Sequence, residues 1–301
     1  MPHAFHRIGL AAGLLIVSAT FAIAQTVKAP VEHLDFDRPE SWAMSWFTSA
    51  TALGAEGPLS VPPGSATLGL EATLLPTLST AQERVGFNGT AVQDLNKGPV
   101  FLRPRFTVGL PGGLAIVVAG TPPIRSFGVT PRLFALGLEW TMYDRSEWRV
   151  AMLGHGQVGT VTGAFVCPST VLAFAPGSPG NATGCEAESS DVATLRYGGA
   201  SLVVGRRLAH GIMPHLSAGI DYESTVFQLN ARAFGRIDQT RLDAQGFVPR
   251  FATGLTAPLA GRFSISADAV YAPLVVRRTA TADRTLDSLL TARALITYRI
   301  H

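Results

Sequence analysis

One stretch, residues 195–227, constrains the fold of this chain more than any other. It holds two long runs in which polar and apolar residues alternate, joined by the short turn at residues 208–211. A period of two is typical of a strand, because successive side chains point to opposite faces. Each run is about twice the usual ~5–6 residues and is as long as the ~9–11 residues that a tilted strand needs to cross a bilayer. In the second run the residues on one face are His215, Ser217, Gly219, Asp221, Glu223 and Thr225. The stretch predicts a membrane-spanning β-hairpin.

The chain begins with the pattern of a secretory signal peptide. His3, His6 and Arg7 form a weakly basic start, an apolar run covers residues 8–23, and small residues precede Gln25. The alternative is a retained anchor, but the run is shorter than the ~20 residues of a spanning helix. We predict that residues 1–24 are removed.

The composition of the remaining chain fits a barrel. Beyond the signal no apolar run approaches the ~20 residues of a spanning helix. Yet 47% of residues are hydrophobic and only 15% are charged, against a typical ~25% charged. In lipid every backbone group must be paired internally, and a closed sheet achieves this without an edge. The balance of 24 Lys and Arg against 21 Asp and Glu is too even to indicate a nucleic-acid partner.

Alternating runs continue along the chain and give about ten strands. The short connections follow the second, fourth, sixth and eighth strands, whereas the long loops follow the others. This alternation predicts an all-β fold: an antiparallel up-and-down transmembrane β-barrel over residues 64–301, with short periplasmic turns and long outer loops. Eight or twelve strands remain alternatives. The predicted strands cover about 65–79, 100–110, 114–120, 132–143, 148–165, two runs within 195–227, 246–257, 262–276 and 289–300.

An N-terminal segment, residues 25–63, does not alternate. Residues 37–40 resemble a capping box with proline in the first turn, so we predict a helix over about 39–53, followed by a proline-rich linker. One interpretation is a plug in the barrel mouth; the other is a helix that covers the periplasmic end or lies at the membrane surface. An aromatic stripe shows only that one face is buried. The plug residues would be Trp42, Trp46 and Phe47.

The polar face of each strand would line the lumen, because the apolar face must meet lipid. Nine arginines and five carboxylates fall on it, and cross-strand pairs are expected for Arg196 with Glu223 and for Arg250 with Asp268. The lumen is then either filled by an ion-pair network or open as a narrow, mildly anion-preferring channel. The predicted lumen residues are Glu71, Arg103, Arg105, Glu139, Arg149, His155, Arg196, Arg206, His215, Asp221, Glu223, Arg250, Arg262, Asp268, Arg293 and Arg299.

Aromatic residues predict two girdles on the lipid face, as membrane interfaces favour. One set lies near the short turns: Trp140, Tyr143, Trp148, Phe263 and Tyr298. The other lies toward the loops: Tyr197, Tyr222, Phe227, Phe247 and Tyr271.

Two cysteines, Cys167 and Cys185, bracket a turn-rich loop. In an oxidising compartment an isolated pair is most simply one disulfide, and two free thiols or a metal site is the alternative. His155 is expected to form hydrogen bonds in the lumen, because no second His or Cys shares its strand. We predict no metal and no cofactor.

The C-terminal residues 294–301, ALITYRIH, resemble the assembly signal of Gram-negative outer-membrane β-barrel proteins, although the chain ends in His301 instead of Phe. The resemblance implies the bacterial outer membrane, surrounding lipid and the barrel-assembly machinery as a partner. His215-Leu216-Ser217 also resembles the His-x-Ser of lipid A deacylases, but it follows a periplasmic turn. The chain has neither the Asp-Asp nor the Asp-x-His pair of the omptin proteases.

Three functional hypotheses follow. The first is a non-enzymatic barrel that passes or binds a small solute, with the N-terminal helix as a gate; no catalytic residue is assigned. The second is an outer-membrane hydrolase acting on lipid or peptide. The third is a structural or adhesive barrel that acts through its outer loops.

Overall fold

The computed structural model describes residues 31–54 and 61–300. The predicted signal peptide and its cleavage site lie outside the described residues, as does Pro58 of the predicted linker. No helix in the described part of the chain is both long enough and apolar enough to cross a membrane.

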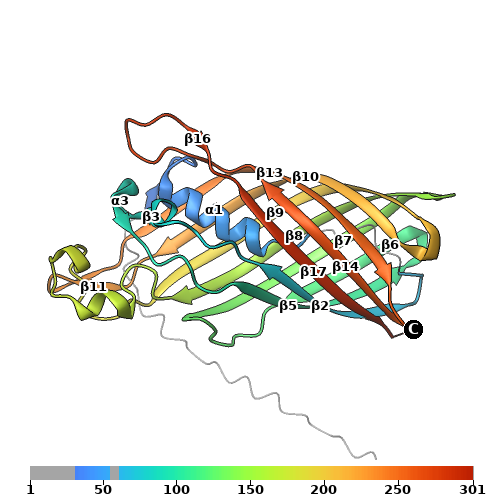
Figure 1. Cartoon of the computed structure of the whole chain (residues 1–301), viewed down its shortest axis with the longest axis horizontal. Helices are drawn as coiled ribbons and strands as arrows, with labels where there is room; N and C mark the ends of the chain where they lie inside the picture. The colour runs from blue at the N-terminus through green and yellow to red at the C-terminus, as the bar shows by residue number, and fades with distance from the viewer. Residues whose placement is uncertain (1–30, 55–60, 301) are drawn as a thin grey trace, which may run out of the picture.

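Ten antiparallel strands of the described residues close into one barrel (Figure 1). Each strand pairs with its neighbour in the chain, and β14 also pairs with β17, which pairs with β2, so that the sheet has no free edge. The predicted fold and the count of ten are therefore confirmed. The barrel strands are β2 (Ala66–Leu74), β5 (Val100–Leu110), β6 (Leu114–Gly120), β7 (Val129–Arg145), β8 (Trp148–Gly163), β9 (Asp191–Arg206), β10 (Met213–Gln228), β13 (Arg241–Pro258), β14 (Phe263–Ala272) and β17 (Leu289–Arg299).

The two ends of the barrel differ. At one end the connections are tight, as at residues 111–113, where Gly112 and Gly113 adopt φ of 76° and 75°. At the other end long loops carry short elements of their own. These are α2 (Thr80–Glu83), β3 (Arg84–Val85), α3 (Gly86–Gly89), β4 (Ala91–Val92), β11 (Ala231–Ala233), β12 (Arg236–Asp238), β15 (Val275–Val276) and β16 (Thr285–Leu286). By the usual layout of such barrels the tight turns are periplasmic and the loop end is outside.

The outward face of the wall is apolar along the strands. On β7 the exposed residues Phe134, Leu136, Leu138 and Trp140 alternate with buried Leu133, Ala135 and Glu139. Alternation of this kind follows from the pleat, and an apolar exterior is what a lipid environment selects. The barrel therefore presents its apolar residues to lipid, as the sequence predicts.

Two predicted girdle residues lie inside instead. Tyr197 on β9 and Phe227 on β10 face inward, and Tyr197 is 6% exposed. Tyr197 contacts the chain just after the N-terminal helix, and Phe227 packs against the apolar cluster around the helix. The inner wall is therefore apolar where the helix packs against it. The prediction assumed a uniformly polar lumen and missed this.

The N-terminal segment lies at the loop end. β1 (Val31–His33) pairs in parallel with residues 241–243 of β13, next to the long β10–β13 loop. Helix α1 (Pro39–Thr51) follows and enters the barrel from that end (Figure 1). The chain reappears at the tight-turn end, where Gly64 N–H donates to the Gly109 carbonyl. Gly109 is required there, because a Cβ would overlap the Pro62 carbonyl.

Helix α1 starts as predicted at Pro39, but not through a capping box. Its N-cap is Arg38, which makes no side-chain cap. Asp37 instead pairs with Arg277 and Arg284 from the β14–β17 loop. An ion pair to another loop replaces the local cap.

Candidate functional site

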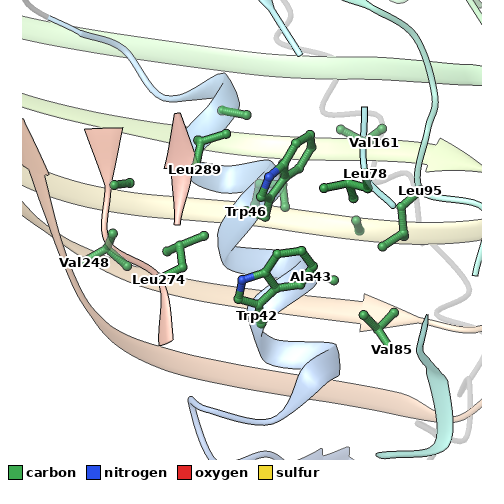
Figure 2. Close-up of a cluster of buried hydrophobic side chains, with 14 of the residues drawn as sticks. Trp42, Ala43, Trp46, Leu78, Val85, Leu95, Val161, Val248, Leu274 and Leu289 are labelled. Carbon is green, nitrogen blue, oxygen red and sulfur yellow. The ribbon is translucent and has the colours of Figure 1, made fainter. Parts of the chain in front are cut away.

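Helix α1 is buried on nearly every side. Twelve of its thirteen residues are buried, whereas a helix on a protein surface buries one stripe. Its outer turns pack Trp42 and Trp46 against leucine and valine side chains of the wall and loops (Figure 2). The Trp42 indole N–H donates to the Asp287 carbonyl at 2.8 Å, and the Arg278 guanidinium lies 4.3 Å from the indole ring centroid.

The inner end of α1 is held by arginines of the wall. Arg103 of β5 donates to the carbonyls of Thr51 (2.8 Å) and Ala52 (3.2 Å), and Arg250 of β13 donates to the Leu53 carbonyl (3.3 Å). The last carbonyls of a helix lack intrahelical partners and carry partial negative charge, so cations there are favourable. Two guanidinium groups thus attach the helix end to opposite parts of the barrel.

Neutral polar side chains add to this attachment. The Leu53 N–H donates to the Tyr197 hydroxyl at 2.5 Å, and the Gln157 amide donates to the Thr51 hydroxyl at 3.3 Å. One turn earlier, the Ser49 hydroxyl donates to Glu223 at 3.0 Å. Tyr197, Gln157 and Ser49 were not among the predicted lumen or plug residues. Gln157 shares the inward face of β8 with His155, and this alternation was the available signal for it.

Below the helix the arginines are paired with acids of the wall. Arg103 and Arg105 lie 2.6 and 3.0 Å from the two carboxylate oxygens of Glu71, and Arg293 lies 3.7 Å away. A second group joins Arg250 to Asp221. Such pairs satisfy charges that would otherwise be very unfavourable at these buried positions.

Two histidines also pair with buried acids of the wall. His155 Nε2 lies 3.5 Å from Asp221 Oδ1 and 3.2 Å from the Ser201 hydroxyl. His215 Nε2 lies 2.5 Å from Asp268 Oδ1, and its Nδ1 lies 3.4 Å from the Met213 carbonyl. Both ring nitrogens of His215 are thus engaged by atoms other than Ser217, so the geometry does not build a His–Ser nucleophile pair.

Twelve of the sixteen predicted lumen residues are buried: Glu71, Arg103, Arg105, Glu139, Arg149, His155, His215, Asp221, Glu223, Arg250, Asp268 and Arg293. Five are arginines and five are carboxylates. The excess of positive charge that suggested an anion preference is therefore absent from this set.

The other four predicted lumen residues are exposed. Arg196 lies on the outward face of β9, because the inward positions there are taken by Leu195 and Tyr197. Arg206 points outward near a tight turn and pairs with Glu147 at 2.7 Å. Arg262 and Arg299 lie at strand ends beside the tight turns, beyond the closed part of the lumen.

Both predicted cross-strand pairs differ as well. Arg196 is too far outside to meet Glu223, which contacts Ser49 instead. Arg250 pairs with Asp221 on the neighbouring β10, and Asp268 pairs with His215. In the observed register Glu223 lies opposite Tyr197 on β9, and Asp268 lies opposite Gly254 on β13, so the register projected from the turns was wrong for both pairs.

An apolar cavity remains between α1 and the barrel wall at the loop end. Its volume is about 270 Å³. Phe47, the third predicted plug residue, lines it, whereas Trp42 and Trp46 are buried in the packing beside it. Interiors pack so densely that few voids exceed one water molecule, so the cavity is a candidate binding site.

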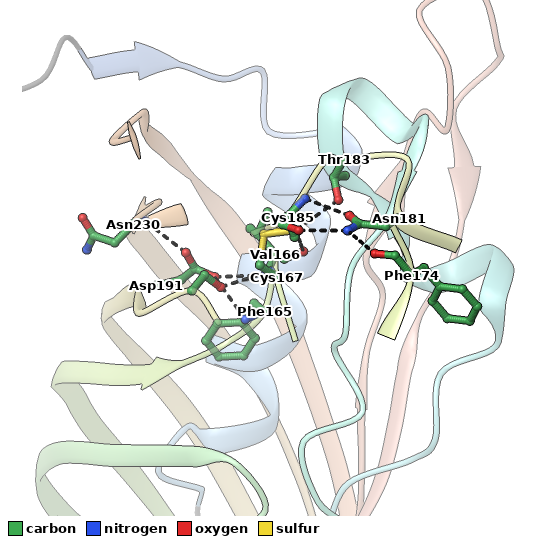
Figure 3. Close-up of a disulfide and its surroundings, with 10 residues drawn as sticks. Phe165, Val166, Cys167, Phe174, Asn181, Thr183, Cys185, Asp191 and Asn230 are labelled. Atoms are coloured by element: carbon green, nitrogen blue, oxygen red, sulfur yellow. Dashed lines mark hydrogen bonds between the residues drawn. A yellow bond between two sulfur atoms is a disulfide. The ribbon is translucent and has the colours of Figure 1, made fainter. Parts of the chain in front are cut away.

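The cysteine loop covers part of this end (Figure 3). Cys167 and Cys185 form the predicted disulfide, with Cα atoms 5.6 Å apart. Asp191, at the start of β9, accepts the backbone N–H groups of Phe165 (3.0 Å) and Val166 (2.9 Å) and that of Asn230 (3.0 Å). One buried carboxylate thus joins the cysteine loop to the β10–β11 connection.

Among the residues that the structure describes, no group of three or more His, Cys, Asp or Glu side chains lies close enough together to hold a metal ion. The disulfide uses both cysteines, so the alternative of a cysteine metal site is wrong.

Comparison with known proteins gives fold-level similarity alone. No family model and no curated protein matches the chain. Among solved structures it is similar to the outer membrane protease OmpT from Escherichia coli, with a TM-score of 0.39 and 7% identity over 82% of this chain and 100% of that chain. It is also similar to the attachment invasion locus protein Ail of Yersinia pestis, with a TM-score of 0.32 and 12% identity over 79% of this chain and 99% of that one.

A third similar structure is LpxR from Salmonella typhimurium, with a TM-score of 0.32 and 11% identity over 77% of this chain and 99% of that chain. At such scores no functional argument passes from these proteins to this one. The assignment rests on the molecule itself: ten paired strands without an edge, an apolar exterior, and tight turns that alternate with long loops. The chain therefore has the architecture of an outer-membrane β-barrel.

Proposed function

We propose that this barrel passes a small solute across the outer membrane and that α1 is its gate. The observation that carries the proposal is the attachment of the helix end by Arg103 and Arg250 across the lumen. With the helix in place, α1 and the side chains packed around it occupy most of the outer half of the barrel, apart from the cavity beside α1. Passage therefore requires the helix to move.

The wall supports a movable helix, because the ion pairs at the inner end of α1 join strand to strand and include no charged group of the helix. Arg103 with Glu71, Arg250 with Asp221, and His215 with Asp268 all join strand to strand. Helix α1 contributes to these groups only backbone carbonyls and hydroxyls. Water can replace such hydrogen bonds at modest net free energy, whereas an orphaned buried charge would not be tolerated. Departure of α1 would leave a polar, wettable ring at the depth of these ion pairs, with an apolar wall on its outer side.

Single-channel conductance in planar bilayers tests the gate. We expect the mature chain to conduct rarely and a chain lacking residues 25–54 to conduct steadily. The Arg278→Ala variant, which removes the contact with the Trp42 ring and leaves the lumen pairs intact, should open more often than wild type. Its matched control is Arg125→Ala, an exposed arginine in the β6–β7 loop. Equal, negligible conductance of all four folded proteins would reject passage.

A further inference from the structure

The cavity beside α1 has the features of a built ligand site. We propose that it binds a small, neutral, largely apolar molecule that carries one hydrogen-bond donor. The inference deepens the proposed function by naming the class of solute, and it is tested by binding instead of by passage.

Apolar side chains from four parts of the chain form the walls. Helix α1 supplies Met44 and Phe47, the β2–β5 loop Leu95, and β9 Leu195, while β10 supplies Phe227. Such a surface gains free energy when it leaves water, in rough proportion to the area covered. Walls contributed by a helix on one side and by strands and loops on the other also explain why the space persists: no single side chain spans it.

One polar group in the wall lacks a partner. Gln93 is 6% exposed, and its side-chain oxygen accepts no hydrogen bond from any residue that the structure describes. Its backbone N–H is fixed by the Glu83 carbonyl at 2.8 Å. Gly86 lies against the amide so closely that a Cβ there would overlap it. A buried acceptor without a donor is unfavourable, so a donor on the ligand would fit this position.

The charges at the outer rim exclude an anion. Glu32, Glu40 and Asp238 line the cavity there with a single cation, Arg38. Arg38 already donates to Glu32 at 2.8 Å and to Glu40 at 3.1 Å. A carboxylate or phosphate entering the cavity would be repelled by the acidic rim, because the one arginine there already donates to Glu32 and Glu40. A neutral donor, such as a hydroxyl or a ring N–H, meets no such repulsion.

Two probes of matched shape separate these features. Indole carries one N–H donor, whereas 1-methylindole is as apolar and lacks it. We would measure the binding of each to the mature protein in lipid nanodiscs by isothermal titration calorimetry, with empty nanodiscs as the reference for partition into lipid. Since one neutral hydrogen bond changes affinity by roughly threefold to tenfold, indole should bind wild type tighter than 1-methylindole by that factor.

Three variants test the assignment to residues. Gln93→Leu should reduce the affinity for indole to that for 1-methylindole and leave the latter unchanged. Gln245→Leu, on the outward face of β13, is the matched control and should preserve the difference. Ala193→Phe places a ring in the cavity and should weaken both probes at least tenfold.

Equal affinity of the two probes for wild type would overturn the proposal without any variant. So would a difference that survives Gln93→Leu, or unchanged binding to folded Ala193→Phe. If the probes bind as expected but no form of the protein conducts, the binding site stands and the proposed passage fails.

Discussion

At the scale of the residue, the stability of the lumen depends on buried charges, each of which needs a partner of opposite charge. Arg250 joins two structures at once: it pairs with Asp221 and donates to the end of α1. The Arg250 guanidinium and the Asp221 carboxylate are both buried. Removing one member of a buried pair leaves the other charged without its main partner, which is far more unfavourable than losing a surface pair.

We therefore expect Arg250→Met to lower the free energy of unfolding by about 3–5 kcal/mol. Urea unfolding of the refolded protein in lipid vesicles measures this. The matched control is Arg196→Met, one strand away from β10 but on the outward face of β9. An apolar side chain is preferred on the lipid face, so this variant should be neutral or stabilising. Equal losses in both variants would contradict the assignment of faces.

Asp37 gives a pH-dependent prediction outside the membrane. Burial raises the pKa of this carboxyl, but hydrogen bonds and attraction from Arg284 and Arg277 outweigh it and hold the pKa below its ordinary value of 3.8. An acid with a lowered folded pKa stabilises the fold above its unfolded pKa and loses that contribution as the pH falls through the folded value. The attachment of α1 to the β14–β17 loop should therefore persist at neutral pH and weaken below 3.8.

The melting temperature of wild type and of Asp37→Asn checks this. The variant should melt lower at neutral pH, and the gap should close as the pH falls below 3.8. Asp283→Asn, which alters an exposed acid in the same loop, should track wild type throughout. A difference in melting temperature that grows as the pH falls would contradict the lowered pKa of Asp37.

The residue pattern predicted the membrane-spanning strands more accurately than it predicted the face of the strand on which each residue lies. On β10 polar side chains mark the inward face, because that part of the lumen holds Asp221 and Glu223. On β9 the same rule fails for Arg196 and Tyr197. The wall there packs against α1 and the cavity, so an apolar face points inward. The sequence holds no local signal that another segment fills the barrel at that depth.

At the scale of the element, the sequence predicted the strands and the helix but not their attachments. β5 and β6 match their predicted bounds, since tight turns and alternation define both ends. Helix α1 begins at the predicted Pro39 and ends two residues early at Thr51. Its contacts with Arg103 and Arg250 could not be predicted, because they join segments far apart in the chain and depend on the direction in which the helix enters.

The cysteine loop shows how an element without regular structure is ordered. The disulfide closes it, and Asp191 collects three backbone N–H groups from both sides of its base, together with the Ser189 hydroxyl at 2.6 Å. A carboxylate acceptor strengthens such hydrogen bonds. The loop should therefore depend on this charge as well as on the covalent link.

We expect Asp191→Asn to increase the rate of proteolytic cleavage within residues 166–190 severalfold while the disulfide stays intact. An amide offers one acceptor oxygen where the carboxylate offers two, so at least one N–H loses its partner. Limited proteolysis of the protein in vesicles, followed by mass spectrometry, measures the rate. Glu188→Gln, an exposed acid in the same loop, is the control. Unchanged cleavage in Asp191→Asn would mean that the disulfide alone orders the loop.

At the scale of the whole molecule, the chain threads its own barrel. β1 and the start of α1 lie at the loop end, while β2 begins at the tight-turn end. Leu53 thus lies inside the barrel, and Gly64 lies at the tight-turn end. A helix that covers the tight-turn end does not agree with this arrangement. It follows that the ten strands close around a segment that precedes them in the sequence.

Threading predicts the side of the membrane on which the N-terminal segment is found. An epitope inserted immediately before Val31 should be labelled by antibody on intact cells, because β1 pairs with β13 beside the long β10–β13 loop. An epitope inserted between Gly112 and Gly113, in a tight turn, should be labelled only after the outer membrane is permeabilised. If the first epitope also requires permeabilisation while the protein is folded, the segment enters from the periplasm. A gate of that kind would open in the opposite direction, so this experiment decides from which side a solute first meets α1.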